Sequence, residues 1–375
     1  MTTHEKRWRL LLGEPASPLS PILTEDEQRM DAALSALYDE DGPRAGLGNS
    51  SPKVSRWLGD IRKYFPSPVV QVMQKDAIER LNLTRLLLEP EILEQAEADV
   101  HLVSQILTLN HLIPAKTRVT ARAVVRRLVD QLLKKLAQPT RSAVQGALTR
   151  GLRNPRPRLR EIDWPRTIRK NLHTWLPAQQ TIIPEKLVGH GRKQSALKDV
   201  ILCIDQSGSM SASIIYSSIF GAVLASLPAL TTRFVLFDTA VVDLTDDLQD
   251  PVDLLFGTQL GGGTDIHKAL RYCEDHITRP RDTTMVLISD LEEGGDQTRM
   301  LQTARRIKES GVNLITLLAL SDEGTPWYSK RYANAYAALD IPVFACTPDQ
   351  FPDLMATALS GKDIHLWAKT HNLGF

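Results

Sequence analysis

The sequence predicts an α/β protein, a doubly wound, mainly parallel sheet preceded by an all-helical N-terminal region. Two observations carry this prediction. From residue 199 onward, short runs that are apolar at every position alternate with longer helical patterns, which is typical of parallel strands covered by helices on both faces. Before residue 150, apolar residues such as Leu102, Ile106 and Leu109 recur at spacings of three and four, and no convincing strand is found.

These patterns divide the chain into four segments. The expected segments are a helical domain over 1–150, a basic linker or strapping segment over 151–197, an α/β domain over 198–362 and a C-terminal extension over 363–375. The first boundary rests on Gly146–Pro165, which holds three prolines and several arginines and therefore cannot continue as one helix. A brief helix is expected just beyond it, over 166–175.

The elements of the α/β domain follow from runs of apolar residues and the breaks between them. The expected strands are 200–204, 234–237, 241–244, 284–289, 314–320 and 343–346. The expected helices are 211–227, 265–276, 298–310 and 348–359. Because ligands of such sheets bind at the carboxyl ends of the strands, a site is expected at that edge.

The composition indicates a soluble cytoplasmic protein. Of its 375 residues, 42% are hydrophobic, and no run reaches the roughly 18 apolar residues that a membrane span needs. The apolar part of the first residues is too short for a signal peptide. The three cysteines, Cys203, Cys273 and Cys346, lie far apart without a CxxC pattern, so they are expected to be reduced and buried.

Three polar clusters fall at the predicted carboxyl edge of the sheet. Asp205, Ser207 and Ser209 follow the first strand, Thr264 follows a run of glycines, and Asp290 ends a central strand. Taken alone, Asp-x-Ser-x-Ser is usually a turn or a helix cap. The three clusters at one edge instead predict a site for a hard cation, since all the donors are oxygens; Mg²⁺ is expected, with Mn²⁺ as the alternative.

Two further aspartates lie beside these clusters. Asp238 follows the second predicted strand, where it either holds a ligand loop by hydrogen bonds or shapes the turn of a hairpin. Asp265 directly follows Thr264 and is expected to cap the next helix.

The five residues Asp205, Ser207, Ser209, Thr264 and Asp290 resemble the metal-ion-dependent adhesion site of von Willebrand factor A (VWA) domains, in the expected order. The resemblance covers roughly residues 198–360. It implies that the serines and the threonine coordinate Mg²⁺ directly or nearly so, and that the aspartates act directly or through water. It also implies that a partner's Asp or Glu completes the coordination.

A second resemblance covers most of the chain. The stretches FDTAVVDLTDD (237–247), QLGGGTDI (259–266), SDLEEGG (289–295) and DWPRTIRKNL (163–172) are similar to bacterial VWA proteins of the CoxE-like group, which accompany MoxR-type AAA+ ATPases. This resemblance implies an adaptor that engages the ATPase, or a client protein that presents Asp or Glu, during remodelling or maturation of that client. No Walker A phosphate-binding pattern is present, so the chain is not expected to be the motor.

The charge is unevenly distributed and leaves a second interpretation open. The net charge is +1, yet Lys116–Lys198 holds 20 basic and 4 acidic residues, which would suit either an acidic protein surface or RNA. VWA domains occur in RNA-binding proteins with a helical preface. Aromatic residues are sparse in this stretch, with only Trp164 and Trp175, so RNA binding is kept as the alternative.

An enzyme is not expected. A Mg²⁺ ion with open positions could activate water for phosphoryl hydrolysis, and Glu292, Glu293 and His267 lie near the predicted ligands in sequence. The glutamates are instead expected in a solvated loop, and the histidine on the polar face of a helix. No Ser/His/Asp or cysteine nucleophile arrangement is found, so no catalytic residue is assigned and a phosphohydrolase is the weakest alternative.

Overall fold

The computed structural model describes residues 23–38, 51–80, 90–150, 153–154, 157, 159, 162–190, 197–257, 263–321 and 327–373. The chain divides into two compact units, Met1–Gln131 and Leu132–Phe375. The division falls inside one long helix, α7 (Ala115–Arg150). The predicted boundary of the helical domain, at residue 150, is the end of this helix rather than the division between the units.

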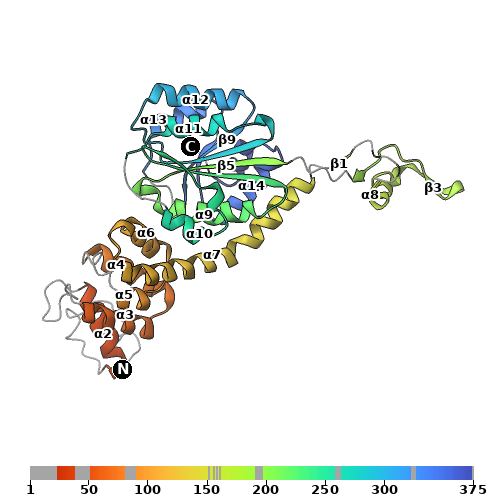
Figure 1. The fold of residues 1–375 in the computed structure, drawn as a ribbon. Coiled ribbons are helices and arrows are strands. Elements are labelled where there is room, and N and C mark those ends of the chain that lie inside the picture. Colours follow the sequence, from red (N-terminus) through yellow and green to blue (C-terminus); the bar gives the residue numbers. More distant parts are fainter. Residues whose placement is uncertain are drawn as a thin grey trace. The chain divides into compact units, whose positions relative to one another are not determined.

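The first unit is helical throughout its described residues, which confirms the prediction for this region. Its helices are α2 (Glu25–Tyr38), α3 (Ser51–Tyr64), α4 (Ser67–Arg80), α5 (Pro90–Gln95), α6 (Val100–Thr108) and the first part of α7 (Figure 1). Helices α2, α3 and α4 share a core around Trp57, Ile61 and Met73. The Trp57 indole donates a hydrogen bond to the Ala33 carbonyl at 2.9 Å, so the buried ring keeps its polar group satisfied.

The second unit contains a six-stranded, mainly parallel sheet, counted over its described residues, and this confirms the predicted fold class. The strands are β5 (Lys198–Asp205), β6 (Leu230–Phe237), β7 (Val241–Asp243), β8 (Thr283–Ile288), β9 (Asn313–Leu320) and β10 (Val343–Cys346). Their order is β10-β9-β8-β5-β6-β7, and β7 alone pairs antiparallel. Residues 200–205 of β5 are buried, as a central parallel strand covered on both faces requires.

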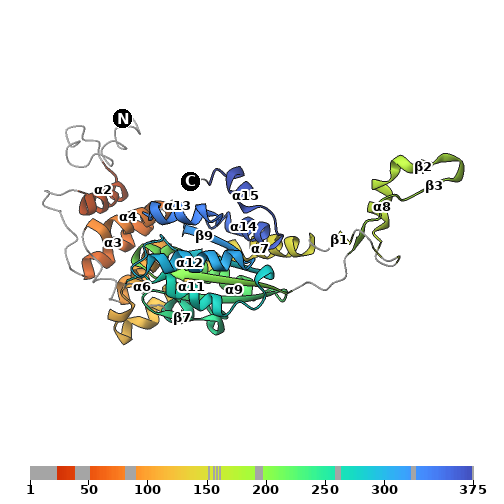
Figure 2. The ribbon, with the colours of Figure 1, turned by 90° about the horizontal axis from the view of Figure 1, so that it is seen from above.

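Helices cover both faces of this sheet. Figure 1 shows α11 (Ile266–Asp275), α12 (Gln297–Glu309) and α13 (Lys330–Ala338) on one face, and α9 (Ser211–Ala225), α10 (Pro251–Gly257) and α14 (Phe351–Leu359) on the other. Near the C-terminus, α15 (Ile364–Thr370) lies beside α14 (Figure 2). Helices α9 and α14 meet through Phe220 and Phe351, whose ring centroids are 4.4 Å apart.

Helix α9 packs very closely on the sheet. A Cβ atom added at Gly221 would lie 2.8 Å from the Phe234 ring and 2.9 Å from Leu248, so only glycine fits there. Within the described residues, one stretch, Gly208–Ala225, is long and apolar enough to cross a membrane, and 67% of it is buried inside the fold. Burial of this extent is what a core helix of an α/β domain shows.

The segment between α7 and the sheet has regular structure of its own. Strand β1 (Arg153–Asn154) pairs with β4 (Gly189–His190), and β2 (Trp175–Leu176) pairs with β3 (Thr181–Ile182), both antiparallel. The helix expected over 166–175 is α8 (Trp164–Lys170), which starts at the Asp163 cap and ends five residues earlier than predicted. A 3₁₀ turn, Leu172–Thr174, replaces its last part.

One asparagine holds this segment together. The Asn171 side chain is fully buried and donates to the carbonyls of Thr167 at 2.7 Å and Lys186 at 2.9 Å. Its carbonyl oxygen accepts hydrogen bonds from the amides of Glu185 at 2.9 Å and Lys186 at 3.0 Å. Thr167 adds two hydrogen bonds to the backbone of Val188. The DWPRTIRKNL stretch therefore fastens α8 to the chain that returns toward β4.

The β6–β7 hairpin carries a pH-dependent contact. Burial raises the pKa of the Asp243 carboxyl, but hydrogen bonds from Thr245, Tyr272 and Arg233 outweigh burial and hold this pKa below its usual value. A lowered folded-state pKa stabilises the fold above the unfolded-state pKa of about 3.9, and this contribution is lost as the pH falls through the folded-state pKa.

We expect Asp243→Asn to lower the free energy of unfolding at neutral pH, because the charged hydrogen bonds to the carboxylate are lost. The expected loss is only about 1 kcal/mol, since the Asp243 side chain is partly exposed. The difference from wild type should shrink as the pH falls below about 4, as urea unfolding at neutral and at acidic pH would measure. Asp246→Asn, at an exposed position three residues on, is the control. A difference that stays constant with pH would contradict the assignment.

Candidate metal centre

The predicted ligands gather at the carboxyl edge of the sheet. Asp205 is the last residue of β5, and Asp290 comes two residues after the end of β8, the strand paired with β5. Ser207 and Ser209 follow β5 directly, before α9. Thr264 stands two residues before the start of α11. The parallel pairing of β5 with β8 thus brings together side chains that are more than 80 residues apart in sequence.

Asp205 is the deepest residue of the site. Its side chain is fully buried, and its two oxygens accept hydrogen bonds from the Ser207 amide and the Ser289 hydroxyl, each at 2.8 Å. Burial, with a smaller contribution from the nearby charge of Asp290, raises the pKa of Asp205 to about 6, although the hydrogen bonds from Ser207 and Ser289 oppose this rise. These hydrogen bonds fix the direction in which the carboxylate faces the loop.

Three more of the predicted residues form a continuous hydrogen-bonded set. The Ser207 and Ser209 hydroxyl oxygens are 3.1 Å apart, and the Ser209 hydroxyl donates to Asp290 at 2.7 Å. The other Asp290 oxygen accepts from the Glu292 amide at 3.1 Å. Asp290 is buried whereas Ser209 is exposed, so the site opens to solvent on its serine side.

The backbone of Thr264 joins the loop before α11 to the loop after β8, and the hydrogen bonds among the other four predicted ligands do not include Thr264. Its carbonyl accepts a hydrogen bond from the Gly294 amide at 2.8 Å, and the Asp265 amide donates to the Asp238 carbonyl at 2.8 Å. The Thr264 side chain is nearly buried. A Cβ atom at Gly294 would lie 2.9 Å from the Thr264 carbonyl oxygen, so this close approach depends on glycine. Residues 261 and 262 of the glycine run lie outside the described residues.

The two neighbouring aspartates have structural roles. The Asp265 carboxylate accepts from the Lys268 amide at 2.9 Å at the start of α11, which confirms the predicted cap. The Asp238 carboxylate accepts from the Ala240 amide at 2.6 Å and so shapes the hairpin turn. Through its carbonyl, Asp238 also holds the loop that carries Thr264.

Glu293 is buried, so the prediction that it lies in a solvated loop is wrong. Only 8% of this residue is exposed. Its carboxylate accepts from the Ile266 amide at 2.7 Å and the Gly295 amide at 3.1 Å. Burial raises the pKa of this carboxyl group. Glu293 therefore joins the loop after β8 to the first turn of α11, while Glu292 is exposed as expected.

The loop after β8 has a strained backbone. Leu291 has a φ of +62°, a region that costs a non-glycine residue on the order of 1 kcal/mol. Its side chain is fully buried, and its amide donates to the Ser289 hydroxyl at 3.0 Å. That hydroxyl donates to Asp205, so this conformation and the buried carboxylate support each other.

The donor set fits a hard divalent cation. Two carboxylates and the serine hydroxyls share one hydrogen-bonded cluster, with Thr264 on the adjoining loop. Among the residues that the structure describes, no Lys, Arg or His forms an ion pair with Asp205 or Asp290. Buried carboxylates are usually paired or bind a metal. All the donors are oxygens and several are hydroxyls, a set that suits Mg²⁺ better than Zn²⁺.

The fold and this edge site together define a VWA-type α/β domain, and comparison with known proteins specifies the family. The model for "VWA domain containing CoxE-like protein" matches residues 132–355, and the chain belongs to this family. The chain is also 33% identical over 369 residues to the uncharacterized protein YehP of Escherichia coli (strain K12), covering 96% of this chain and 98% of that protein. The resemblance to the CoxE-like group is therefore confirmed.

Similar solved structures cover part of the chain. One is an aerotolerance-related membrane protein from Bacteroides fragilis NCTC 9343, with 14% identity and a TM-score of 0.34 over 44% of this chain and 99% of that chain. Another is the conserved hypothetical protein BatB from Bacteroides thetaiotaomicron, with 13% identity and a TM-score of 0.32 over 44% of this chain and 98% of that one.

Proposed function

We propose that this protein is a divalent-metal-dependent adaptor that binds another protein through the edge site and works beside a MoxR-type AAA+ ATPase in the cytoplasm. One observation carries the proposal: Asp205, Ser207, Ser209 and Asp290 form a single oxygen cluster with two carboxylates and, among the described residues, no paired cation. Membership of the CoxE-like family supports a role in protein interaction. In this proposal, the client is a protein that presents an Asp or Glu side chain to the metal ion.

In this proposal the ligands of the ion are Asp205, Ser207, Ser209, Thr264 and Asp290. A Mg²⁺ ion would supply a Lewis-acidic centre with a position for one carboxylate oxygen of the partner. Three of the five ligands are neutral hydroxyls, so two negative charges leave the ion attractive to a third. The serine side of the cluster is the exposed side, so the partner carboxylate would approach there.

We do not assign catalysis to this site. The Glu293 carboxylate accepts two backbone amides and is occupied as a structural group. His267 contacts the Thr303 hydroxyl on α12 at 3.3 Å. A general base must reach the proton that it abstracts, and these contacts hold both candidates in other roles.

The first test is direct metal binding by the full chain. We expect Mn²⁺, followed by electron paramagnetic resonance and competed by Mg²⁺, to occupy one site in wild type. Asp205→Ala and Asp290→Ala should each weaken binding by more than about 100-fold, since a ligand contributes more than its supporting partners do. Asp275→Ala, an exposed acid at the end of α11, should bind as wild type does. Equal titrations of all four proteins would exclude the metal site.

The second test addresses the partner. We expect a purified MoxR-type ATPase from the same organism to be retained by the immobilised wild-type chain, with retention lost in EDTA and in Asp205→Ala. Retention that is unchanged by both treatments would contradict a metal-dependent contact. Recovery of RNA that is released at about 0.5 M salt would instead favour the RNA-binding alternative, because phosphate contacts weaken steeply with salt.

A further inference from the structure

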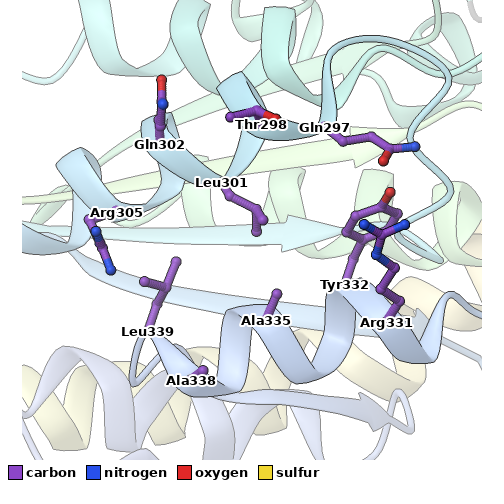
Figure 3. A pocket seen from close by; sticks show the side chains of 10 residues that line it. All are labelled: Gln297, Thr298, Leu301, Gln302, Arg305, Arg331, Tyr332, Ala335, Ala338 and Leu339. Carbon is purple, nitrogen blue, oxygen red and sulfur yellow. The ribbon is translucent and has the colours of Figure 1, made fainter.

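A groove runs between α12 and α13 on one face of the sheet. Its volume is about 460 Å³, within the range of sites that bind ligands or side chains. Figure 3 shows its lining: the apolar part comes from Leu301 of α12 and from Ala335, Ala338 and Leu339 of α13 and its end. The alanine side chains are short, so the backbone of another helix could approach α13 closely.

Arginines lie at the two ends of this groove. Arg331 lies beside Gln297 and Tyr332, whereas Arg305 lies at the opposite end near Leu339 (Figure 3). The two ends correspond to Gln297 and Arg305 on α12, eight residues apart, which is about 12 Å or two helical turns.

Among the residues that the structure describes, the charges of both arginines have little compensation. Arg305 is 3.9 Å from Glu309, and these side chains are 62% and 70% exposed, so this pair contributes little. Arg331 stacks over the Tyr332 ring at 5.5 Å from the centroid. Within the ranges that the structure describes, Arg331 has no ion pair. The groove therefore combines an apolar floor with a positive charge at each end.

We propose that this groove binds an amphipathic helix of a partner protein that carries acidic residues two turns apart and apolar residues between them. Two acidic side chains at positions i and i+7 lie about two helical turns apart, which is the spacing of Gln297 and Arg305 along the groove on α12. The groove lies between two parallel helices with a floor of small residues, which suits a third helix packing along them. Arginine forms bidentate pairs with carboxylates, so acidic residues are the complement of both ends.

This surface is distinct from the metal ligands, although it starts at the same edge of the sheet. The Ser329 amide, just before α13, donates to the Asp290 carbonyl at 2.9 Å. None of the groove residues is a proposed ligand, so the inference goes beyond the adaptor proposal and does not depend on the metal.

The experiment is a selection of displayed random peptides on the full wild-type chain. The peptides should be about 20 residues long, because shorter isolated helices are marginal in water. We expect the enriched sequences to share two acidic positions seven residues apart with apolar residues between them. Fluorescence anisotropy with an enriched peptide then gives its affinity for each variant.

Charge reversal tests the arginines. Arg305→Glu combined with Arg331→Glu should lower the affinity for the peptide by about tenfold or more. The same peptide with lysine at its two acidic positions should bind this double variant better than it binds wild type, a gain that a misfolded protein could not give. Arg299→Glu, on α12 but outside the groove lining, is the matched control.

Asp205→Ala should bind the selected peptide as wild type does, which separates this surface from the metal site. The proposal is overturned if no peptide is enriched, if the enriched peptides lack the acidic pair, or if they bind wild type and the double variant equally. If the wild-type chain bound the peptide but did not bind Mn²⁺, the result would count against the metal centre alone.

Discussion

Glu293→Ala is expected to lower the affinity for Mn²⁺ or Mg²⁺ by about 10–100-fold while all five proposed ligands remain in place, as is typical when a supporting residue is lost. The Glu293 carboxylate accepts the Ile266 amide at 2.7 Å and the Gly295 amide at 3.1 Å. Without the Glu293 carboxylate, the hydrogen bond from the Gly294 amide to the Thr264 carbonyl still joins the two loops. The loop that carries Thr264 would then be held less firmly against the loop that carries Asp290.

Two measurements check this expectation. Metal titration gives the affinity, and thermal unfolding in EDTA gives the stability of the metal-free protein, which should fall by about 1–3 kcal/mol because the Ile266 amide is left buried without an acceptor. Glu292→Ala removes the exposed neighbour and is the matched control. If Glu293→Ala lost stability yet bound metal with wild-type affinity, the carboxylate would be structural and would not position the ligand.

Asn171→Ala is expected to open the segment between α8 and β4. Four hydrogen bonds of a fully buried side chain are lost, and the amides of Glu185 and Lys186 are left without an acceptor. We expect a local cost of about 2–4 kcal/mol, since each unsatisfied buried group costs about 1–3 kcal/mol. The sheet should be unaffected, because β5 to β10 pair only with one another.

Hydrogen exchange measured by mass spectrometry distinguishes local opening from global unfolding. Peptides from 163–190 should lose protection, whereas peptides from β5, β8 and β9 should keep it. Asn334→Ala, an asparagine exposed on α13, should change neither. Unaltered protection over 163–190 would show that the buried amide is dispensable.

The sheet could be predicted from the sequence because its strands are apolar on both faces. Runs such as 200–204 and 284–288 have no other stable place than a sheet covered by helices. Three helices were missed: α10, α13 and α15. Helix α13 is poor in large apolar residues, with Ala333 and Tyr336 among its few buried positions, so its periodicity is weak. Helix α10 begins with Asp250 and Pro251, a start signal that could have identified it.

The candidate site shows a similar limit. The positions of Asp205, Ser207, Ser209, Thr264 and Asp290 at the ends of predicted strands and before a predicted helix place all five residues at one edge of one sheet. The supporting groups were not predictable, because Ser289 and Glu293 act through contacts between loops that only the pairing of β5 with β8 creates. In a single sequence, Glu293 is one acid in an acidic, glycine-containing stretch, and nothing local indicates that it is buried.

The pairing of β5 with β8 also determines when the site can exist. Asp205 and its hydrogen-bond partner Ser289 are separated by 84 residues, which a ribosome takes roughly 4–17 s to add at about 5–20 residues per second. During that interval the first aspartate has been synthesised, but the strand that completes its surroundings has not. In the proposed site, metal affinity should therefore be absent from a nascent chain released before β8, because Ser289 and Asp290 have not yet been added.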